Sequence, residues 1–270
     1  VTIGSIEKYI TEKAWENGWV KPIQNKNDKN QTVGIIGSGP AGLACGEELR
    51  KKGYKITIYD RYDRAGGLLI YGIPNFKLEK HVVERRINLL KEGGINFVQN
   101  FEVGKDATLA EIRNKHDAIL IATGVYKARE VNLPGNDLSN IFPAMEFLTA
   151  SNKKGLGDDV ELFDDGTLNA EGKDIVVIGG GDTAMDCVRT SVRQNAKSVK
   201  CLYRRDRENM PGSAREVGNA EEEGVEFIWL SNPKEFKGTN KVNSLLVDKM
   251  ELGEPDESGR RKPVVRKNSE

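Results

Sequence analysis

Residues 32–60, TVGIIGSGPAGLACGEELRKKGYKITIYD, place the strongest constraint on how this chain can fold. A β-branched run opens into three glycines, then a helical stretch and a second β-branched run, which predicts strand, turn, helix and strand. Gly37 allows the tight turn, Gly39 lets a diphosphate approach the backbone, and Gly42 lets the helix lie close to the sheet. The unpaired N–H groups at the start of that helix favour an anion.

An acid, Asp60, ends the second predicted strand. A carboxylate at this place accepts hydrogen bonds from a ribose hydroxyl but repels a 2′-phosphate, so the site favours FAD or NAD over NADP. A glycine-rich turn alone is weak evidence, but here Thr32 to Ile36 supply a strand before it and Ile56 to Tyr59 a strand after it. We therefore predict a dinucleotide site rather than a plain turn. Its other predicted members are Ser38, Pro40, Ala41 and Arg61.

Composition and charge argue against several other classes of protein. Lys plus Arg and Asp plus Glu both number 41, so no basic excess points to nucleic acid or to a membrane surface. No apolar run is long enough to span a bilayer and no signal-peptide pattern is present, so we expect a cytoplasmic protein. Cys45, Cys187 and Cys201 lie far apart without a C-x-x-C motif, which argues against a dithiol redox centre and an iron–sulfur cluster.

The first half is predicted to form an FAD-binding domain over residues 32–145, after an N-terminal helix and linker in residues 1–31. The loop of residues 61–80 mixes apolar residues with glycines. We expect it to fold over a ligand, because ligands lie outside the carboxyl ends of the strands in such sheets. Residues 117–124, DAILIATG, predict an apolar strand whose small last residues, Thr123 and Gly124, permit close approach of a ligand.

The opening pattern returns in residues 173–206, KDIVVIGGGDTAMDCVRTSVRQNAKSVKCLYRRD. Gly179, Gly181 and Ala184 take the places of the three earlier glycines, so we predict a second dinucleotide unit. Asp182 follows the glycines and is expected to cap the helix rather than to contact phosphate. The residues counted with this second cofactor site are Gly180, Asp182 and Thr183.

The residues at the end of the second dinucleotide unit indicate which coenzyme it binds. Where an acid closes the first copy, Tyr203, Arg204 and Arg205 close this one. Two arginines can hold the 2′-phosphate of NADP through charge-assisted hydrogen bonds, each worth about 1.5–3 kcal/mol. Even one such bond favours NADPH over NADH by roughly ten- to a hundredfold. The plainer alternative is an exposed basic strand end.

Three further patterns describe the second domain, which we expect to span residues 146–270. Residues 151–174 mix Gly, Asp and Lys without periodicity and predict a solvated connecting loop. Ser213 and Glu216 form an S-x-x-E pattern that predicts a capping box at a helix start. Residues 233–265 hold three strand-like runs and predict an antiparallel meander. The fold class is α/β, with two Rossmann-like dinucleotide-binding domains and a short N-terminal helix.

Two dinucleotide units in one chain, one refusing and the other accepting a 2′-phosphate, predict a flavin held by the first and NADPH by the second. The cofactors then carry a hydride transfer, and the protein needs only to align them and exclude water. We assign no catalytic side chain and no metal ligand. The sequence shows no Ser/His/Asp arrangement, metal-ligand cluster or paired carboxylates.

Long runs of the chain also resemble a known family, the small (beta) subunits of bacterial NADPH-dependent glutamate synthase, over essentially all 270 residues. The wider flavoprotein group, with its disulfide-reductase-like pair of domains, includes the amino-terminal part of dihydropyrimidine dehydrogenase and the flavin subunits of ferredoxin:NADP transhydrogenases. The runs that carry the resemblance are GSGPAGLAC, DRAGGLLIYGIPNFKLEK, IGGGDTAMDCVRTSVRQ and YRRDRENMPGSAREVGNAEEEGVEF.

The resemblance implies an NADPH-dependent oxidoreductase. In that family the small subunit takes hydride from NADPH onto FAD and passes electrons through iron–sulfur clusters to a large (alpha) subunit, which makes two glutamates from glutamine and 2-oxoglutarate. Gly67 and Leu68 are implied to lie along the flavin, and Thr123 and Gly124 to close that site. The second glycine turn, with Arg204 and Arg205, is implied to hold NADPH.

The chain also departs from that family. It begins at Val1, without the cysteine-rich cluster segment that family members carry, and stops before their return to the FAD domain. We therefore expect a fragment with an incomplete FAD site, whose iron–sulfur clusters belong to the missing segment or to the partner. Two alternatives stay open: a flavin subunit of an NADPH:ferredoxin-type oxidoreductase, and a nucleotide-binding module without redox activity. A thioredoxin-reductase-like enzyme is disfavoured because C-x-x-C is absent.

Overall fold

The computed structural model divides the chain into two compact units. The first unit comprises Val1–Ile70 and Leu78–Val125, and the second comprises Tyr71–Lys77 and Tyr126–Glu270. The change at residues 125 and 126 lies before the division predicted at residues 145 and 146, which stays a prediction about the two cofactor domains. The structure describes residues 2–25, 27–128, 131–255, 257, 259, 261–267 and 269.

The first unit is built on a parallel sheet with the strand order β3-β2-β1-β4. This order confirms the predicted strand, turn, helix and strand, because β1 pairs in parallel with β2 along its whole length, from Thr32 opposite Lys55 to Ile36 opposite Tyr59. Ile35, Ile56 and Ile58 are buried in its core. The strands are β1 (Thr32–Ile36), β2 (Lys55–Tyr59), β3 (Ile95–Val98) and β4 (Ala118–Ile121).

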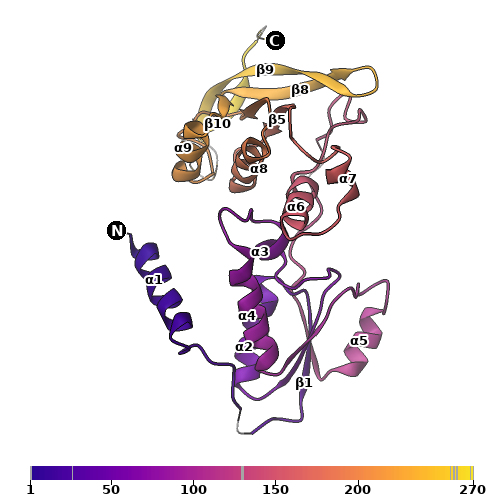
Figure 1. Ribbon diagram of the computed structural model, residues 1–270. Coiled ribbons are helices and arrows are strands. Elements are labelled where there is room, and N and C mark those ends of the chain that lie inside the picture. The colour runs from indigo at the N-terminus through magenta and orange to yellow at the C-terminus, as the bar shows by residue number, and fades with distance from the viewer. Residues whose placement is uncertain are drawn as a thin grey trace. The chain divides into compact units, whose positions relative to one another are not determined.

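Helices cover both faces of this sheet. Figure 1 shows α2 and α4 on one face and α5 on the other. Helix α2 can lie close to the sheet because Gly46 has no side chain, and a Cβ there would come within 3.1 Å of Ile58 Cδ1. The helices of this unit are α1 (Ile3–Glu16), α2 (Pro40–Lys51), α4 (Lys80–Glu92) and α5 (Leu109–Lys115), and α3 (Leu68–Tyr71) ends at the first residue of the second unit.

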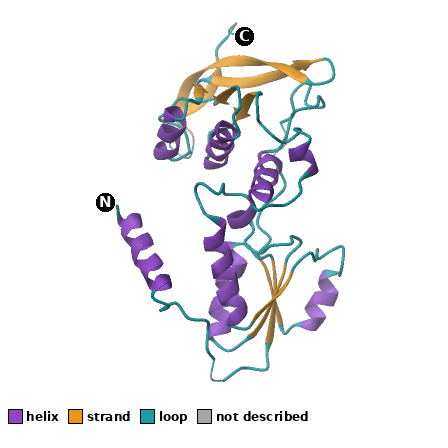
Figure 2. Ribbon diagram, viewed as in Figure 1, coloured by secondary structure: helices purple, strands orange, loops and turns teal. Residues whose placement is uncertain are grey.

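The second unit contains a smaller parallel sheet of order β5-β6-β7 and an antiparallel sheet of order β10-β9-β8. Helices α8 and α9 lie on one side of the parallel strands and the antiparallel sheet lies on the other (Figure 2). The predicted meander is therefore confirmed. The strands are β5 (Asp174–Ile178), β6 (Ser198–Leu202), β7 (Glu226–Ile228), β8 (Ser231–Gly238), β9 (Val242–Pro255) and β10 (Arg261–Val265).

The predicted connecting loop over residues 151–174 was wrong in part. Helix α6 (Ala144–Gly155) runs into it and a short helix, α7 (Glu161–Asp164), lies inside it. Helix α6 is buried through the apolar residues Leu148 and Ala150, and both lie before residue 151, where the aperiodic stretch begins. The remaining helices of the unit are α8 (Asp182–Arg193) and α9 (Ala214–Glu222).

Candidate functional site

The first glycine turn joins β1 to α2. Gly37 has a φ of 106°, which favours glycine, and a Cβ there would lie 2.4 Å from the carbonyl oxygen of Ala122 and 3.1 Å from Thr123 Cα. The turn therefore packs directly on the end of β4, which brings Thr123 next to it. Thr123 and Gly124 are exposed. The structure thus gathers the predicted residues from β1 and β4 at the carboxyl edge of one sheet.

Asp60 organises this turn. Its Oδ2 accepts hydrogen bonds from the backbone N–H of Ser38 at 2.7 Å and from Ser38 Oγ at 2.6 Å, while Oδ1 accepts one from the N–H of Tyr62 at 2.9 Å. Both Asp60 and Ser38 are buried. A carboxylate has about four acceptor positions, so one position on Oδ1 remains for a ribose hydroxyl.

The loop that follows Asp60 also folds back onto the turn. The N–H of Gly66 donates to the carbonyl oxygen of Ser38 at 3.0 Å, and Gly67 has a φ of 54°. Leu68, at the start of α3, is 46% exposed. Arg61 lies with its guanidinium 5.0 Å from the centre of the Tyr62 ring. The loop predicted to cover a ligand is therefore in contact with the predicted diphosphate site.

The N-terminus of α2 fits a diphosphate. Its N-cap residue, Gly39, offers no side-chain hydrogen bond to the first N–H groups, and a Cβ on Gly39 would meet open space. Pro40 and Ala41 form the first turn of the helix. Because the leading N–H groups keep no side-chain cap, they can donate to phosphate oxygens, where the helix dipole adds to the attraction.

Gly42 closes the turn from the helix side. A Cβ on Gly42 would lie only 2.0 Å from the carbonyl oxygen of Gly37. The same Cβ would lie 3.3 Å from Ile35 Cγ2 in β1, so the close approach of helix and sheet predicted for the third glycine is present in the structure.

The second glycine turn joins β5 to α8 in the same way. Gly181 is the N-cap of α8 without a side-chain hydrogen bond, and a Cβ on it would meet open space. The ring of Tyr203 packs on the turn so closely that a Cβ on Gly180 would lie 2.4 Å from Tyr203 Cε2. Gly179 has a φ of 148°, and its N–H donates to Leu202 O at 3.1 Å. This turn also fits a diphosphate, held by the uncapped first turn of a twelve-residue helix that includes Thr183 and Ala184.

The two arginines predicted to hold a 2′-phosphate lie in different surroundings. Arg204 is exposed and lies two residues after the end of β6. Arg205 is 6% exposed, and its Nε donates to the carbonyl oxygen of Arg261 in β10 at 2.8 Å. Arg204 is thus available to a ligand. A direct role for Arg205 stays a prediction, because at least one of its donors serves the antiparallel sheet.

Two capping predictions were wrong. Asp182 is the first residue of α8 rather than its cap, and its Oδ1 accepts the N–H of Ser213 at 3.1 Å. Ser213 does occupy the N-cap of α9, but its side chain makes no capping bond there. Glu216 does not reach back to it because its carboxylate pairs with Arg189 at 2.7 Å. Long-range ion pairing outcompetes the local motif.

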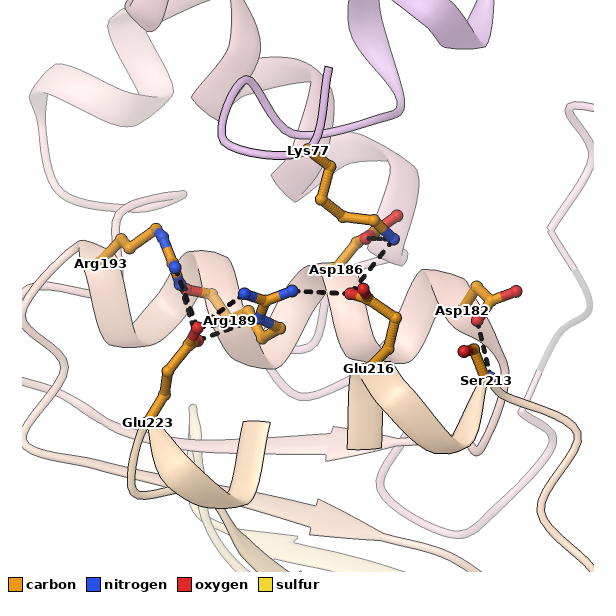
Figure 3. A network of polar contacts seen from close by, with 8 residues as sticks. All are labelled: Lys77, Asp182, Asp186, Arg189, Arg193, Ser213, Glu216 and Glu223. Atoms are coloured by element: carbon orange, nitrogen blue, oxygen red, sulfur yellow. Dashed lines mark hydrogen bonds and ion pairs between the residues drawn. The ribbon is translucent and has the colours of Figure 1, made fainter. Parts of the chain in front are cut away.

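Sequence reasoning missed a network of ion pairs along α8 (Figure 3). In order, Asp186, Lys77, Glu216, Arg189, Glu223 and Arg193 form an unbroken line of contacts with alternating charge. The signal was present in the sequence: Asp186, Arg189 and Arg193 are spaced i, i+3 and i+7, which places these three charged residues along one side of a helix.

The network shifts the pKa values of two of its acidic residues in opposite directions. Hydrogen bonds from Arg193 and Arg189 lower the pKa of Glu223 to about 2. Burial raises the pKa of Asp186, and the hydrogen bond from Lys77 opposes that rise. The Lys77 ammonium group therefore favours the charged form of Asp186.

Two of the three cysteines are poorly suited to thiol chemistry. Burial raises the pKa of Cys187 and of Cys201 to about 12, so neither is a thiolate at neutral pH, and all three cysteines are free. Within the described ranges, no three His, Cys, Asp or Glu side chains gather in a way that could hold a metal ion. Among those same residues, no helix has both the length and the apolar character needed to cross a bilayer.

Two sheets with uncapped glycine turns at their carboxyl edges define a class of protein that binds two dinucleotides. Comparison with known families agrees: the sequence profile of the pyridine nucleotide-disulphide oxidoreductases matches residues 31–258. The chain belongs to this family. It is therefore an oxidoreductase domain with the α/β fold that the sequence predicted.

Individual relatives within the family are similar to the whole of this chain. The chain is 60% identical over 270 residues to a glutamate synthase [NADPH] small chain of Azospirillum brasilense, covering 100% of this chain and 56% of that protein. It is 47% identical over 272 residues to the protein of the same name from Escherichia coli, covering 100% and 57%. The chain thus spans little more than half the length of these relatives.

A solved structure shares the fold. FprA of Mycobacterium tuberculosis in complex with NADPH superposes with a TM-score of 0.76 at 19% sequence identity, over 90% of this chain and 68% of that one. At this identity the likeness concerns the fold alone.

Proposed function

We propose that this chain is the FAD- and NADPH-binding part of a glutamate synthase small chain. It would pass a hydride from NADPH to FAD, with electrons going on through iron–sulfur clusters to a large subunit that makes L-glutamate from L-glutamine and 2-oxoglutarate. The names and identities of the two small-chain relatives support this proposal. The clusters would be held outside these 270 residues.

The residues of the first unit would hold FAD. The uncapped first turn of α2 would bind the diphosphate, and the remaining acceptor position on Asp60 would bind a ribose hydroxyl. When bound, FAD supplies the hydride-accepting ring. The proposed members of this site are Gly37, Ser38, Gly39, Pro40, Ala41, Gly42, Asp60, Arg61, Gly67, Leu68, Thr123 and Gly124.

The residues of the second unit would hold NADPH. The first turn of α8 would bind its diphosphate, and Arg204 would bind its 2′-phosphate. No side chain needs to act as an acid or base, because hydride transfer moves no separate proton through the protein. The proposed members of this site are Gly179, Gly180, Gly181, Asp182, Thr183, Ala184, Arg204 and Arg205.

The assignment of FAD to the first site and of NADPH to the second rests on one observation. The two units have the same turn and helix, but the strand next to each glycine turn ends in opposite charge, with buried Asp60 after β2 and exposed Arg204 after β6. The carboxylate excludes a 2′-phosphate from the first site and the guanidinium attracts one to the second. The three free cysteines are compatible with the reducing cytoplasm, where we place the protein as part of this proposal.

Arginine variants test the coenzyme assignment. Arg204→Ala should raise the Kd for NADPH by roughly ten- to a hundredfold, the equivalent of one charge-assisted hydrogen bond, and should change the Kd for NADH by less than about threefold. Arg207→Ala is the matched control, since Arg207 pairs with Glu221 at 2.8 Å. If Arg204→Ala weakens the binding of NADPH and NADH equally, Arg204 does not bind the 2′-phosphate.

The visible spectrum tests the redox proposal. After incubation with FAD and removal of the excess, the chain should show a flavin band that bleaches with anaerobic NADPH and only slowly with NADH. Glutamate formation should then need an added large subunit and the cluster segment. A preparation that binds NADPH but never retains flavin would favour a nucleotide-binding module without redox activity.

A further inference from the structure

Residues 71–77, YGIPNFK, belong to the second unit although the chain on both sides of them belongs to the first. We call these residues the clip segment. The chain therefore passes between the units three times, after Ile70, after Lys77 and after Val125. Each passage is a covalent link between the two units.

Helix α6 holds the start of the clip segment. Asn152 is 6% exposed, and its Nδ2 donates to the carbonyl oxygens of Tyr71 at 3.0 Å and Gly72 at 3.4 Å. The ammonium group of Lys153 lies 5.3 Å from the centre of the Tyr71 ring. A buried amide that satisfies two backbone carbonyls fixes the path of the chain here, because these carbonyls would otherwise lose their partner.

Helix α8 holds the end of the segment through an aromatic ring and two cations. The guanidinium groups of Arg193 and Arg189 lie 3.8 Å and 4.9 Å from the centre of the Phe76 ring. Both distances fall within the range of cation–π attraction. The same arginines are fixed by Glu223 and Glu216, so the ring rests on side chains that cannot easily turn away.

Lys77 supplies the electrostatic part of the attachment. Its Nζ lies 2.8 Å from Asp186 Oδ1 and 3.5 Å from Glu216 Oε2 (Figure 3). The Lys77 side chain is 24% exposed and that of Asp186 only 10%. Without Lys77, Asp186 would be separated from the line of alternating charges, and an acidic residue from which solvent is nearly excluded is costly to leave unpaired.

The clip segment links two predicted cofactor sites. Upstream it continues directly from α3, which begins at Leu68, the residue implied to lie along the flavin. Lys80 Nζ donates to the carbonyl oxygen of Leu69 at 3.1 Å and so ties α3 to the start of α4. Downstream contacts of the segment are to α8, whose first turn is proposed to hold NADPH.

We propose that Lys77 and Phe76 are positioning residues that attach the clip segment to α8, so that the chain leaving the flavin loop moves as part of the nucleotide unit. The catalytic consequence rests on the proposed function. Hydride transfer needs reacting atoms at about 3–3.5 Å, and a displacement of about 1 Å costs on the order of a hundredfold in rate. Loss of the attachment should therefore slow flavin reduction while leaving nucleotide binding intact.

Hydrogen exchange tests the attachment itself. In Lys77→Met, the amides of residues 71–77 should exchange at least tenfold faster than in the wild type, while those of the glycine turn before α8 keep their protection. Lys77→Arg should restore protection. Lys197→Met is the matched control, because Lys197 pairs with Asp174 at 3.1 Å in the same unit but outside α6 and α8, the helices that hold the segment. Unchanged exchange at residues 71–77 in Lys77→Met and in Phe76→Ala would overturn the proposal.

A double variant separates attachment from folding. Lys77→Met alone leaves Asp186 unpaired and can destabilise the unit, whereas Lys77→Met with Asp186→Asn removes both charges and should regain the wild-type melting temperature. Exchange at residues 71–77 should stay raised in the double variant. If exchange returns to wild-type values together with the melting temperature, Lys77 acts only on stability and the positioning role is wrong.

Single-turnover kinetics test the consequence for the reaction. In FAD-loaded protein, Lys77→Met and the double variant should reduce flavin with NADPH roughly ten- to a hundredfold more slowly, with the Kd for NADP⁺ unchanged within twofold. Raised exchange with an unchanged rate would refute the positioning role. If the wild type itself reduces no flavin, the proposed function fails, and the exchange experiment still decides whether the segment is attached.

Discussion

Replacement of Gly42 by Ala is the sharpest test of how the first glycine turn is packed. The Cβ of an alanine at this position would lie 2.0 Å from the carbonyl oxygen of Gly37 and 3.3 Å from Ile35 Cγ2. The obstacle is backbone, and a carbon and an oxygen need more than about 3 Å, so α2 or the turn must move by about 1 Å. Overpacking of this kind costs about 1–3 kcal/mol, and a backbone obstacle places this case at the upper end.

The helix itself opposes part of that cost. Alanine is better than glycine inside a helix by about 1 kcal/mol, so the net loss in the free energy of unfolding should be about 2 kcal/mol. For a unit of this size, 1 kcal/mol corresponds to about 3–5 °C in melting temperature, so we expect a fall of about 6–10 °C by calorimetry of the full chain. FAD retention should fall with it, because the displaced turn is the proposed diphosphate site.

Gly46→Ala is the control within the same helix. It has the same gain in helix propensity, but its Cβ would meet Ile58 Cδ1 at 3.1 Å, the end of a flexible side chain, rather than backbone. We expect its melting temperature to stay within about 3 °C of the wild type, since the gain and the contact nearly cancel. A Gly42→Ala protein as stable as Gly46→Ala would refute the packing argument.

Three more predictions concern other parts of the chain. Hydrogen bonds from Arg193 and Arg189 hold the pKa of Glu223 at about 2, below its ordinary 4.5, so its contribution to stability is complete above pH 4.5 and is lost as the pH falls towards 2. Because solvent reaches the ion pairs of Glu223 with Arg189 and Arg193, this contribution should be about 1–2 kcal/mol. In Glu223→Gln, the free energy of unfolding measured in urea should therefore change less with pH between 4.5 and 2 than it does in the wild type. Gly135→Ala should destabilise the second unit by about 2 kcal/mol in urea unfolding, because Gly135 has a φ of 77° and its Cβ would lie 2.2 Å from a carbonyl oxygen in β8; equal midpoints would contradict this. Arg85→Met should speed tryptic cleavage within α1, since Arg85 binds the carboxylate of Glu12 there; cleavage at the wild-type rate would mean that other contacts hold the helix.

Local patterns predicted most of the fold. Both glycine turns, the strands around them and the antiparallel meander follow from residue types whose conformational preferences act over a few positions, such as Gly37 with its positive φ. The same holds for α4 (Lys80–Glu92), whose buried residues Val83, Ile87 and Leu90 recur at helical spacing. The cofactor residues around these turns stay a prediction, and it could be made from the sequence because the turn itself determines which backbone groups face a ligand.

Long-range pairing could not be predicted in the same way. The partner of Lys77 is Asp186, which lies 109 positions further along the chain. Glu216 pairs with Arg189 instead of forming the capping box that was predicted for it. Arg205 shows the same limit, because only the folded chain reveals that β10 approaches its Nε. Side chains with several charged partners within reach are decided by tertiary packing, which a single sequence does not display.

The clip segment limits how this chain could be recombined with its relatives. A single crossover after Val125 would exchange α8 and α9 but leave residues 71–77 behind, so the lysine and phenylalanine of one parent would have to fit the helix of the other. A working hybrid would need to inherit residues 71–77 and 126–270 from the same parent. Neither unit therefore corresponds to one contiguous stretch of the gene.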